Sequence, residues 1–125
     1  MSEIRFTEDH EWAQKEGDVI TVGITDYAQS QLGDIVYVEL PDVGRTVDQG
    51  EETAVVESVK AAGDVKSPVT GEIVEVNDVL NDEPELVNQD PVNEGWFFKI
   101  KMMEPDQFDA LQDSDSYDKL VESLS

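Results

Sequence analysis

Short runs of apolar and β-branched residues, separated by turn residues, dominate most of the chain. Runs at 11–14 and 19–24 lie on either side of Gly17, which predicts a hairpin with a glycine turn. Further strands are expected at 35–40, 53–58, 64–67, 72–76 and 95–102. These runs have the length and the composition of strands, so the pattern predicts a mostly β fold.

Two parts of the chain depart from this strand pattern. Residues 25–33 predict a short helix, with Thr25 as its N-cap and Gly33 at its end. Near the C-terminus, apolar residues recur at helical spacing at Phe108, Leu111, Tyr117, Leu120, Val121 and Leu124. Pro105 fits the first turn of one helix there, and Ser114 fits the N-cap of a second.

One internal repeat connects the predicted strands. The sequence at 33–38 recurs in similar form at 71–76, and that at 47–50 recurs at 87–90. Two similar halves indicate a quasi-two-fold β structure. The connection between the halves has its midpoint near Lys60, at the predicted tip of a hairpin.

The length of 125 residues suits one domain, which we place at 1–125, with a β core at about 18–102 and a helical segment at about 105–124. The chain has no cysteine, which excludes disulfides, thiolate metal sites and a cysteine nucleophile. Its one histidine, His10, excludes a metal site built from several histidines of one chain. One histidine and no cysteine cannot supply a nucleophile–base pair, so the sequence argues against an enzyme.

Thirty acidic residues against eight basic ones give a net charge of −22. Such a surface repels phosphate groups, so neither nucleic acid nor an anionic membrane is expected as a partner. Acid spread over a globular pattern is typical of halophilic proteins, the alternative being an acidic protein from an ordinary cytoplasm. The first residues lack the basic and apolar regions of a signal peptide, and we expect a cytoplasmic protein.

Lys60 stands out among the few lysines because its neighbours Val59, Ala61, Ala62 and Gly63 are small or uncharged. A lysine at a hairpin tip is accessible to the active site of another enzyme. The position alone favours an ordinary exposed turn lysine.

The motif around Lys60 resembles the attachment signature of lipoylated carrier domains. More specifically, the chain resembles the H-protein family of the glycine cleavage system. The stretches that carry this second resemblance follow the family's order over most of the chain: 10–12, 22–28, 32–41, 55–61 and 93–96. The stretch 67–71 belongs to the attachment signature around Lys60. Gly63 and Lys66 depart from the residues more often found in the family, which leaves the lysine motif intact.

The resemblance implies a lipoyl-domain-like barrel-sandwich hybrid with lipoate amide-linked to Lys60. It also implies a non-enzymatic carrier in glycine catabolism and one-carbon metabolism. Such a carrier takes the aminomethyl group of glycine from the decarboxylating glycine dehydrogenase to the aminomethyltransferase, and dihydrolipoamide dehydrogenase reoxidises it. The resemblance implies that Glu57 is part of what the lipoate-attaching enzyme recognises. Without the resemblance, Glu57 is equally well explained as a solvated carboxylate on a strand.

Other carriers fit the sequence less well. Biotin carriers usually have methionine on both sides of the lysine, where this chain has Val59 and Ala61. Acyltransferase lipoyl domains usually have aspartate before the lysine and are joined to catalytic domains. An H-like protein that relays lipoyl groups to other complexes stays open as an alternative.

Three further sets of residues have structural interpretations. His10 is expected to tie down the first strand beside Trp12, with a contact to the loaded arm as the alternative. Trp96 and Phe98 are expected in the core or at its edge. Asp113, Asp115 and Asp118 lack the glycine and glutamate of a calcium loop and are interpreted as solvated or capping groups.

Overall fold

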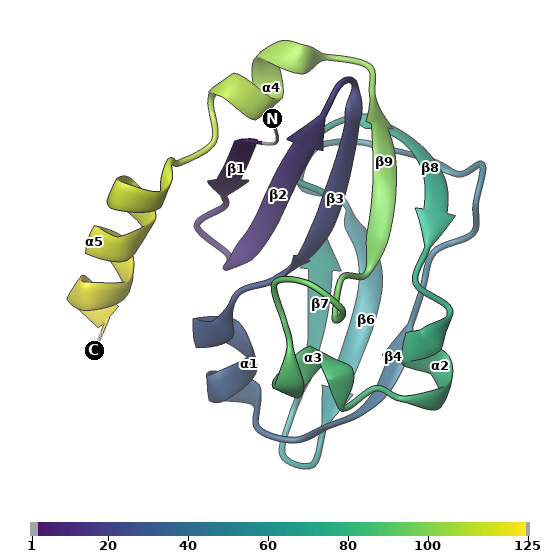
Figure 1. Cartoon of the computed structure of the whole chain (residues 1–125), viewed down its shortest axis with the longest axis vertical. Coiled ribbons are helices and arrows are strands. Elements are labelled where there is room, and N and C mark those ends of the chain that lie inside the picture. Colours follow the sequence, from purple (N-terminus) through teal and green to yellow (C-terminus); the bar gives the residue numbers. More distant parts are fainter. Residues whose placement is uncertain (1–2, 125) are drawn as a thin grey trace.

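The computed structural model describes residues 3–124 and consists mainly of two antiparallel sheets (Figure 1). One has six strands, in the order β1 (Glu3–Phe6), β2 (Glu11–Glu16), β3 (Val19–Ile24), β9 (Phe98–Met102), β8 (Gly71–Val76) and β5 (Thr46–Val47). The other has three strands, in the order β4 (Ile35–Glu39), β6 (Glu52–Ser58) and β7 (Ala62–Lys66). The mostly β prediction is therefore confirmed. Met1, Ser2 and Ser125 of the predicted domain lie outside the described residues.

The helices are α1 (Asp26–Leu32), α2 (Val79–Asp82), α3 (Leu86–Gln89), α4 (Pro105–Asp109) and α5 (Ser114–Leu124). The prediction for α1 is confirmed in its caps as well as its position. The side chain of Thr25 accepts a hydrogen bond from the amide of Ala28, and Gly33 ends the helix with a φ of 83°. No helix between residues 3 and 124 is both long and apolar enough to cross a membrane.

Some elements differ from the prediction. The helices α2 and α3 were not predicted, because four residues are too few to show helical periodicity. The last strand begins at Phe98 rather than at 95. Ser114 is already the first residue of α5, and the carboxylate of Asp113 accepts the amide of Ser116 over 2.9 Å, so Asp113 is the capping residue.

The core lies between the two sheets, and strands such as β8 and β9 fill it with alternate residues. Ile20 of β3 and Ile73 of β8 both pair with Ile100 of β9, and all three are fully buried. The core also includes Trp12 and Phe108, so packing extends beyond both ends of the segment 18–102.

Trp12 fixes one wall of the molecule because of a glycine in the neighbouring strand. A Cβ atom at Gly23, its cross-strand partner, would lie 2.7 Å from the indole ring. The indole nitrogen of Trp12 donates to the carbonyl oxygen of Pro91 over 2.9 Å. The ring therefore requires glycine at position 23 and links β2 to the loop that follows α3.

The sequence repeat is visible as two strands in different sheets. The first copy forms β4 of the three-stranded sheet, and the second forms β8 of the six-stranded sheet. The second repeated pair is not equivalent in structure, because Val47 lies in a strand and Val87 in a helix. Both side chains are buried, so the repeat preserves the pattern of burial rather than the type of element.

Candidate functional site

Lys60 lies at the free end of the hairpin formed by β6 and β7. The two strands pair in antiparallel fashion up to Glu57 and Ala62, and the turn contains Val59, Lys60 and Ala61, all exposed. The hairpin projects from the end of the molecule at which α1 and α3 lie (Figure 1). The structure thus shows the tip position that the sequence predicted for Lys60.

The side chain of Ser58 closes the turn that carries Lys60. Its hydroxyl oxygen accepts hydrogen bonds from the amides of Lys60 (3.2 Å) and Ala61 (3.0 Å), and the hydroxyl group donates to the carbonyl oxygen of Ala61 over 3.0 Å. The amide of Ser58 donates to the same carbonyl oxygen over 2.8 Å. A single hydroxyl therefore gives the tip a defined backbone shape.

The tip rests on the segment that connects α1 to β4. The amide of Val59 donates to the carbonyl oxygen of Asp34 over 3.0 Å. The Lys60 side chain lies over Gly33, where an added Cβ atom would be 3.3 Å from the Lys60 Cε atom. Glycine at position 33 thus leaves room for the lysine stem and also adopts the positive φ that ends α1.

A groove of about 200 Å³ begins beside the tip. Its apolar wall includes Ile24, Ala28, Leu32 and Val56. Gly63, which follows the tip, also lines it, and so do the polar side chains of His10, Glu11 and Asp64. Leu32 directly precedes Gly33, so the groove continues from the surface on which the Lys60 stem lies. It combines an apolar surface with carboxylates within the same small space.

Glu11 is the most buried acid of this region, with 2% of its surface exposed. Its carboxylate accepts hydrogen bonds from the Thr7 hydroxyl (2.6 Å) and from the amide of Lys66 (3.2 Å). Burial nevertheless raises the pKa of Glu11 above its ordinary value, because desolvation outweighs these two hydrogen bonds. Glu11 therefore holds β7 against the β1–β2 turn from inside the protein.

His10 joins the groove to the C-terminal helix. Its Nδ1 atom lies 2.8 Å from the Tyr117 hydroxyl, which lies 2.6 Å from the Thr25 hydroxyl. The imidazole ring also packs against Tyr27, with ring centres 4.8 Å apart. His10 has a φ of 73°, an uncommon conformation for a residue other than glycine. These contacts give His10 a structural role, as expected, but they link it to α1 and α5.

We expect His10 to make the stability of the protein sensitive to mild acid. Burial lowers its pKa below 6.5, against an opposing effect of Asp9, so the folded chain resists protonation of the ring. This contribution to the free energy of unfolding is complete above pH 6.5 and is lost as the pH falls through the lowered pKa. His10→Gln should not show this acid-induced decrease in the free energy of unfolding. Denaturant titrations of both proteins from pH 7.5 downward would measure the difference. Parallel pH profiles would contradict the prediction.

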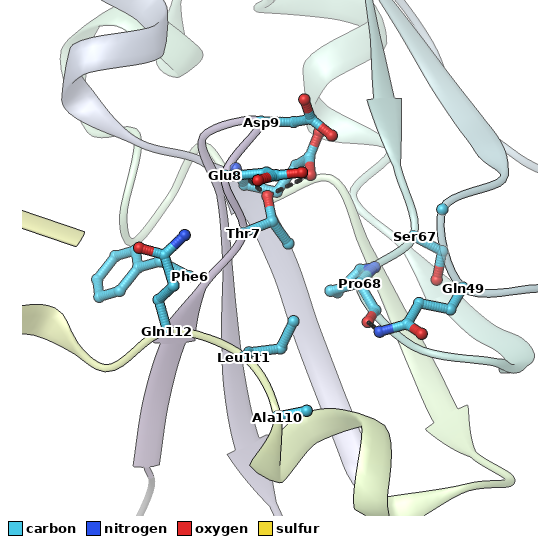
Figure 2. Close-up of a pocket in the computed structure, with 12 residues that line it drawn as sticks. Phe6, Thr7, Glu8, Asp9, Gln49, Ser67, Pro68, Ala110, Leu111 and Gln112 are labelled. Carbon is cyan, nitrogen blue, oxygen red and sulfur yellow. Dashed lines mark hydrogen bonds between the residues drawn. The ribbon is translucent and has the colours of Figure 1, made fainter. Parts of the chain in front are cut away.

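A second pocket, of about 320 Å³, shares Asp9 and Glu11 with the groove. Thr7, Glu8 and Asp9 of the β1–β2 turn lie across from Ser67 and Pro68 (Figure 2). The linker between α4 and α5, at 110–112, forms its third side. Lys60 and its turn line neither cavity. The groove is the better candidate for an arm attached to Lys60, because its lining includes Leu32, next to Gly33, and Gly63, close to the tip.

The remaining candidate residues lie in varied positions. Glu57 is exposed on β6, opposite Tyr37 and Ala62, at one end of the tip. Phe98 is fully buried, whereas Trp96 precedes β9 and is half-buried, with the Lys99 ammonium 5.0 Å from its ring centre. Asp113 caps α5, whereas Asp115 and Asp118 are exposed. Within residues 3–124, no three His, Asp or Glu side chains are grouped as a metal site would require.

Comparisons with known proteins agree over almost the whole chain. A family model described as "Glycine cleavage H-protein" matches residues 4–124. The sequence is 52% identical over 124 residues to a glycine cleavage system H protein of Parvibaculum lavamentivorans, covering 99% of both chains. It is 58% identical over 118 residues to one of Thermus thermophilus, covering 94% of this chain and 92% of that one.

The fold is likewise similar to a solved structure. The crystal structure of a glycine cleavage system H protein from Mycobacterium marinum matches with a TM-score of 0.82 and 37% identity. The match covers 92% of this chain and 93% of that one. This likeness confirms the predicted lipoyl-domain-like barrel-sandwich hybrid with its additional helices.

Proposed function

Because the chain belongs to the glycine cleavage H-protein family, which consists of lipoyl carriers rather than enzymes, we propose that its lipoate is amide-linked to Lys60. One observation carries the proposal. Lys60 is presented at an exposed turn that Ser58 closes, and its stem lies over a glycine that leaves it room. The chain is accordingly a carrier protein of the glycine cleavage system.

The residues around Lys60 fit the properties of a lipoyl arm. Lipoate supplies a disulfide that accepts the aminomethyl group of glycine and is reduced as it does so. The apolar side of the groove, with Leu32 and Val56, suits a hydrocarbon arm, and burial there would exclude water from it. The carboxylates of Glu11 and Asp64 suit a cationic amine. We therefore propose this groove as the resting place of the loaded arm.

Amide formation would also change the charge of the tip. Lys60 would lose its positive charge, which takes the net charge of the chain from −22 to −23. The exposed acids beside the tip, Glu57 and Asp64, would then face a partner without a nearby lysine charge. Modification would thus make this end of the molecule more acidic.

The partners that we propose are those of the glycine cleavage reaction sequence. They are the decarboxylating glycine dehydrogenase, the aminomethyltransferase and dihydrolipoamide dehydrogenase, together with a lipoate-attaching enzyme that contacts Glu57. The support is physical as well as comparative. An arm fixed to one small domain stays at high effective concentration near each active site to which the domain docks.

The docking of these partners should depend on the acids beside the tip. Glu57→Gln combined with Asp64→Asn should slow aminomethyl loading about threefold to tenfold at low salt, because exposed charges mainly set association rates. The control combines Asp115→Asn with Asp118→Asn, which removes two exposed acids from α5 without disturbing the Asp113 cap. Loading of fully lipoylated protein by the decarboxylating enzyme measures the effect.

The same experiment at molar potassium chloride tests the electrostatic explanation. The difference between the two double variants should shrink to about twofold or less, because the Debye length falls to about 3 Å at 1 M salt. Equal loading rates at low salt would show that the tip acids take no part in docking.

The domain limits and the cellular setting belong to the same proposal. We propose that residues 1–125 form one carrier domain, which the buried contacts of Trp12 and Phe108 at its two ends support. We also propose a cytoplasmic protein adapted to salt, on the ground of its acidic composition. Cell fractionation tests the location.

The alternative, an H-like relay of lipoyl groups to other complexes, can be tested directly. Lipoylated chain is mixed with glycine, the decarboxylating enzyme and the aminomethyltransferase. The proposed function requires glycine-dependent loading of the arm and its release to tetrahydrofolate. Failure of loading, with lipoate transfer to other carriers intact, would favour the relay.

A further inference from the structure

The position of Lys60 depends on contacts from outside its own hairpin. Val59 donates to the carbonyl oxygen of Asp34, and the Lys60 stem lies over Gly33. Both contacts are made by the segment 33–35, which runs from the end of α1 into β4. If this segment moved, the turn closed by Ser58 would keep its local shape but lose its support on the body of the protein.

One side chain of α3 holds the segment 33–35 at both ends. The Nδ2 atom of Asn88 donates to the carbonyl oxygen of Gly33 over 2.9 Å. The Oδ1 atom of Asn88 accepts the amide of Ile35 over 2.8 Å. The second hydrogen of Nδ2 is used on α1, because it donates to the Oε1 atom of Gln29 over 2.8 Å. Both donors and the acceptor of the amide are therefore engaged.

The chemistry of these contacts requires a side-chain amide. An aspartate would place a carboxylate against the carbonyl oxygen of Gly33 and the Oε1 atom of Gln29, neither of which can donate. An alanine would leave the amide of Ile35 and the carbonyl of Gly33 without the partners they have now. The partners are 53 to 59 positions away from Asn88 in the sequence, so the contacts exist only in the folded chain.

We propose that Asn88 is a positioning residue for Lys60, holding the segment 33–35 so that the hairpin tip is ordered before an attaching enzyme binds it. An ordered tip binds more tightly because less conformational entropy is lost on binding. The reaction part of this inference rests on the proposed function of Lys60. The ordering part stands on the contacts of Asn88 alone.

A matched pair of variants separates this role from general stability. Asn88→Ala removes the support of the tip. Asn77→Ala is the control, because Asn77 is buried and its Nδ2 donates to the carbonyl oxygens of Glu94 (2.8 Å) and Trp96 (2.9 Å), which lie in the loop before β9 and outside the segment 33–35. Both variants lose part-buried amide hydrogen bonds, so both should lower the melting temperature.

The first measurement is hydrogen exchange at the amide of Val59 in the full, unmodified chain. This amide does not contact Asn88, so a change in its exchange reports on the support and not on a lost bond. Asn88→Ala should speed the exchange of the Val59 amide about tenfold relative to that of the Ile100 amide in the central strand β9. Asn77→Ala should leave this ratio within about twofold.

The second measurement is the kinetics of lipoate attachment with excess lipoyl donor. Asn88→Ala should raise the KM for the unmodified chain about threefold to tenfold, with kcat changed less than about twofold, because the loss lies in ordering the tip for binding. A merely structural effect would instead be shared by Asn77→Ala.

Equal Val59 exchange ratios and equal KM values in the two variants would overturn the inference. Lipoate on a different lysine would instead overturn the proposed function. In that case the exchange ratio at Val59 would still decide whether Asn88 orders the tip, so the two failures are distinguishable.

Discussion

Lys60→Arg should abolish lipoate attachment and, with it, glycine-dependent loading of the chain. Arginine keeps a positive charge and a long side chain, but its guanidinium group stays protonated and cannot form the lysine amide. Loading by the decarboxylating enzyme should therefore fall to the background of a reaction without carrier. Intact mass and the incorporation of labelled glycine measure the two losses separately.

The fold should survive this substitution. Lys60 is exposed, and its stem only lies over Gly33, so the melting temperature should change by no more than about 2 °C. Lys66→Arg is the matched control, since Lys66 is a nearby lysine on β7 that pairs with Asp9 over 3.6 Å. Full lipoylation of Lys60→Arg together with loss in Lys66→Arg would reverse the assignment.

Potassium chloride should raise the melting temperature of the protein by roughly 10 °C or more between dilute buffer and 1 M salt. Eight basic residues cannot neutralise thirty acidic ones, and within residues 3–124 four ion pairs are present. The remaining acids repel one another in the compact fold, and added salt screens this repulsion. Thermal unfolding followed by circular dichroism at increasing salt measures the effect.

The shape of the salt dependence identifies its cause. Screening should raise the melting temperature steeply at first and then level off, as the Debye length shrinks from about 30 Å at 0.01 M to about 3 Å at 1 M salt. If salt acted through a general effect on water instead, the melting temperature would continue to rise in proportion to the salt concentration. A flat melting temperature over the whole range would reject the proposed adaptation to salt.

The sequence predicts those features of the site that depend on neighbouring residues. Thr25 and Gly33 delimit α1 because capping and helix ending are local, and the tip at Lys60 follows from two strands around a short turn. The N-cap of α5 was less certain, because Asp113 and the neighbouring Ser114 are both residue types that cap helices. The structure shows that Asp113 is the cap.

The features that sequence reasoning missed depend on contacts between distant segments. The proximity of Gly33 to the Lys60 stem requires α1 and the hairpin to pack together. The short helix α3 has no periodic pattern, and Asn88 within it shows its role only when it contacts Gly33 and Ile35. Similarly, the groove combines β2, α1, β6 and β7, which no local pattern places side by side.

The central claim, that lipoate is attached to Lys60, is tested most directly by locating the modification in protein from lipoate-supplied cells. Cleavage after glutamate releases residues 58–72, which contain both Lys60 and Lys66. Fragmentation of this peptide in the mass spectrometer then separates the two lysines. The structure and the family predict a single lipoyl group on Lys60 and an unmodified Lys66. A lipoyl group on Lys66, or on any lysine outside this peptide, would contradict the claim.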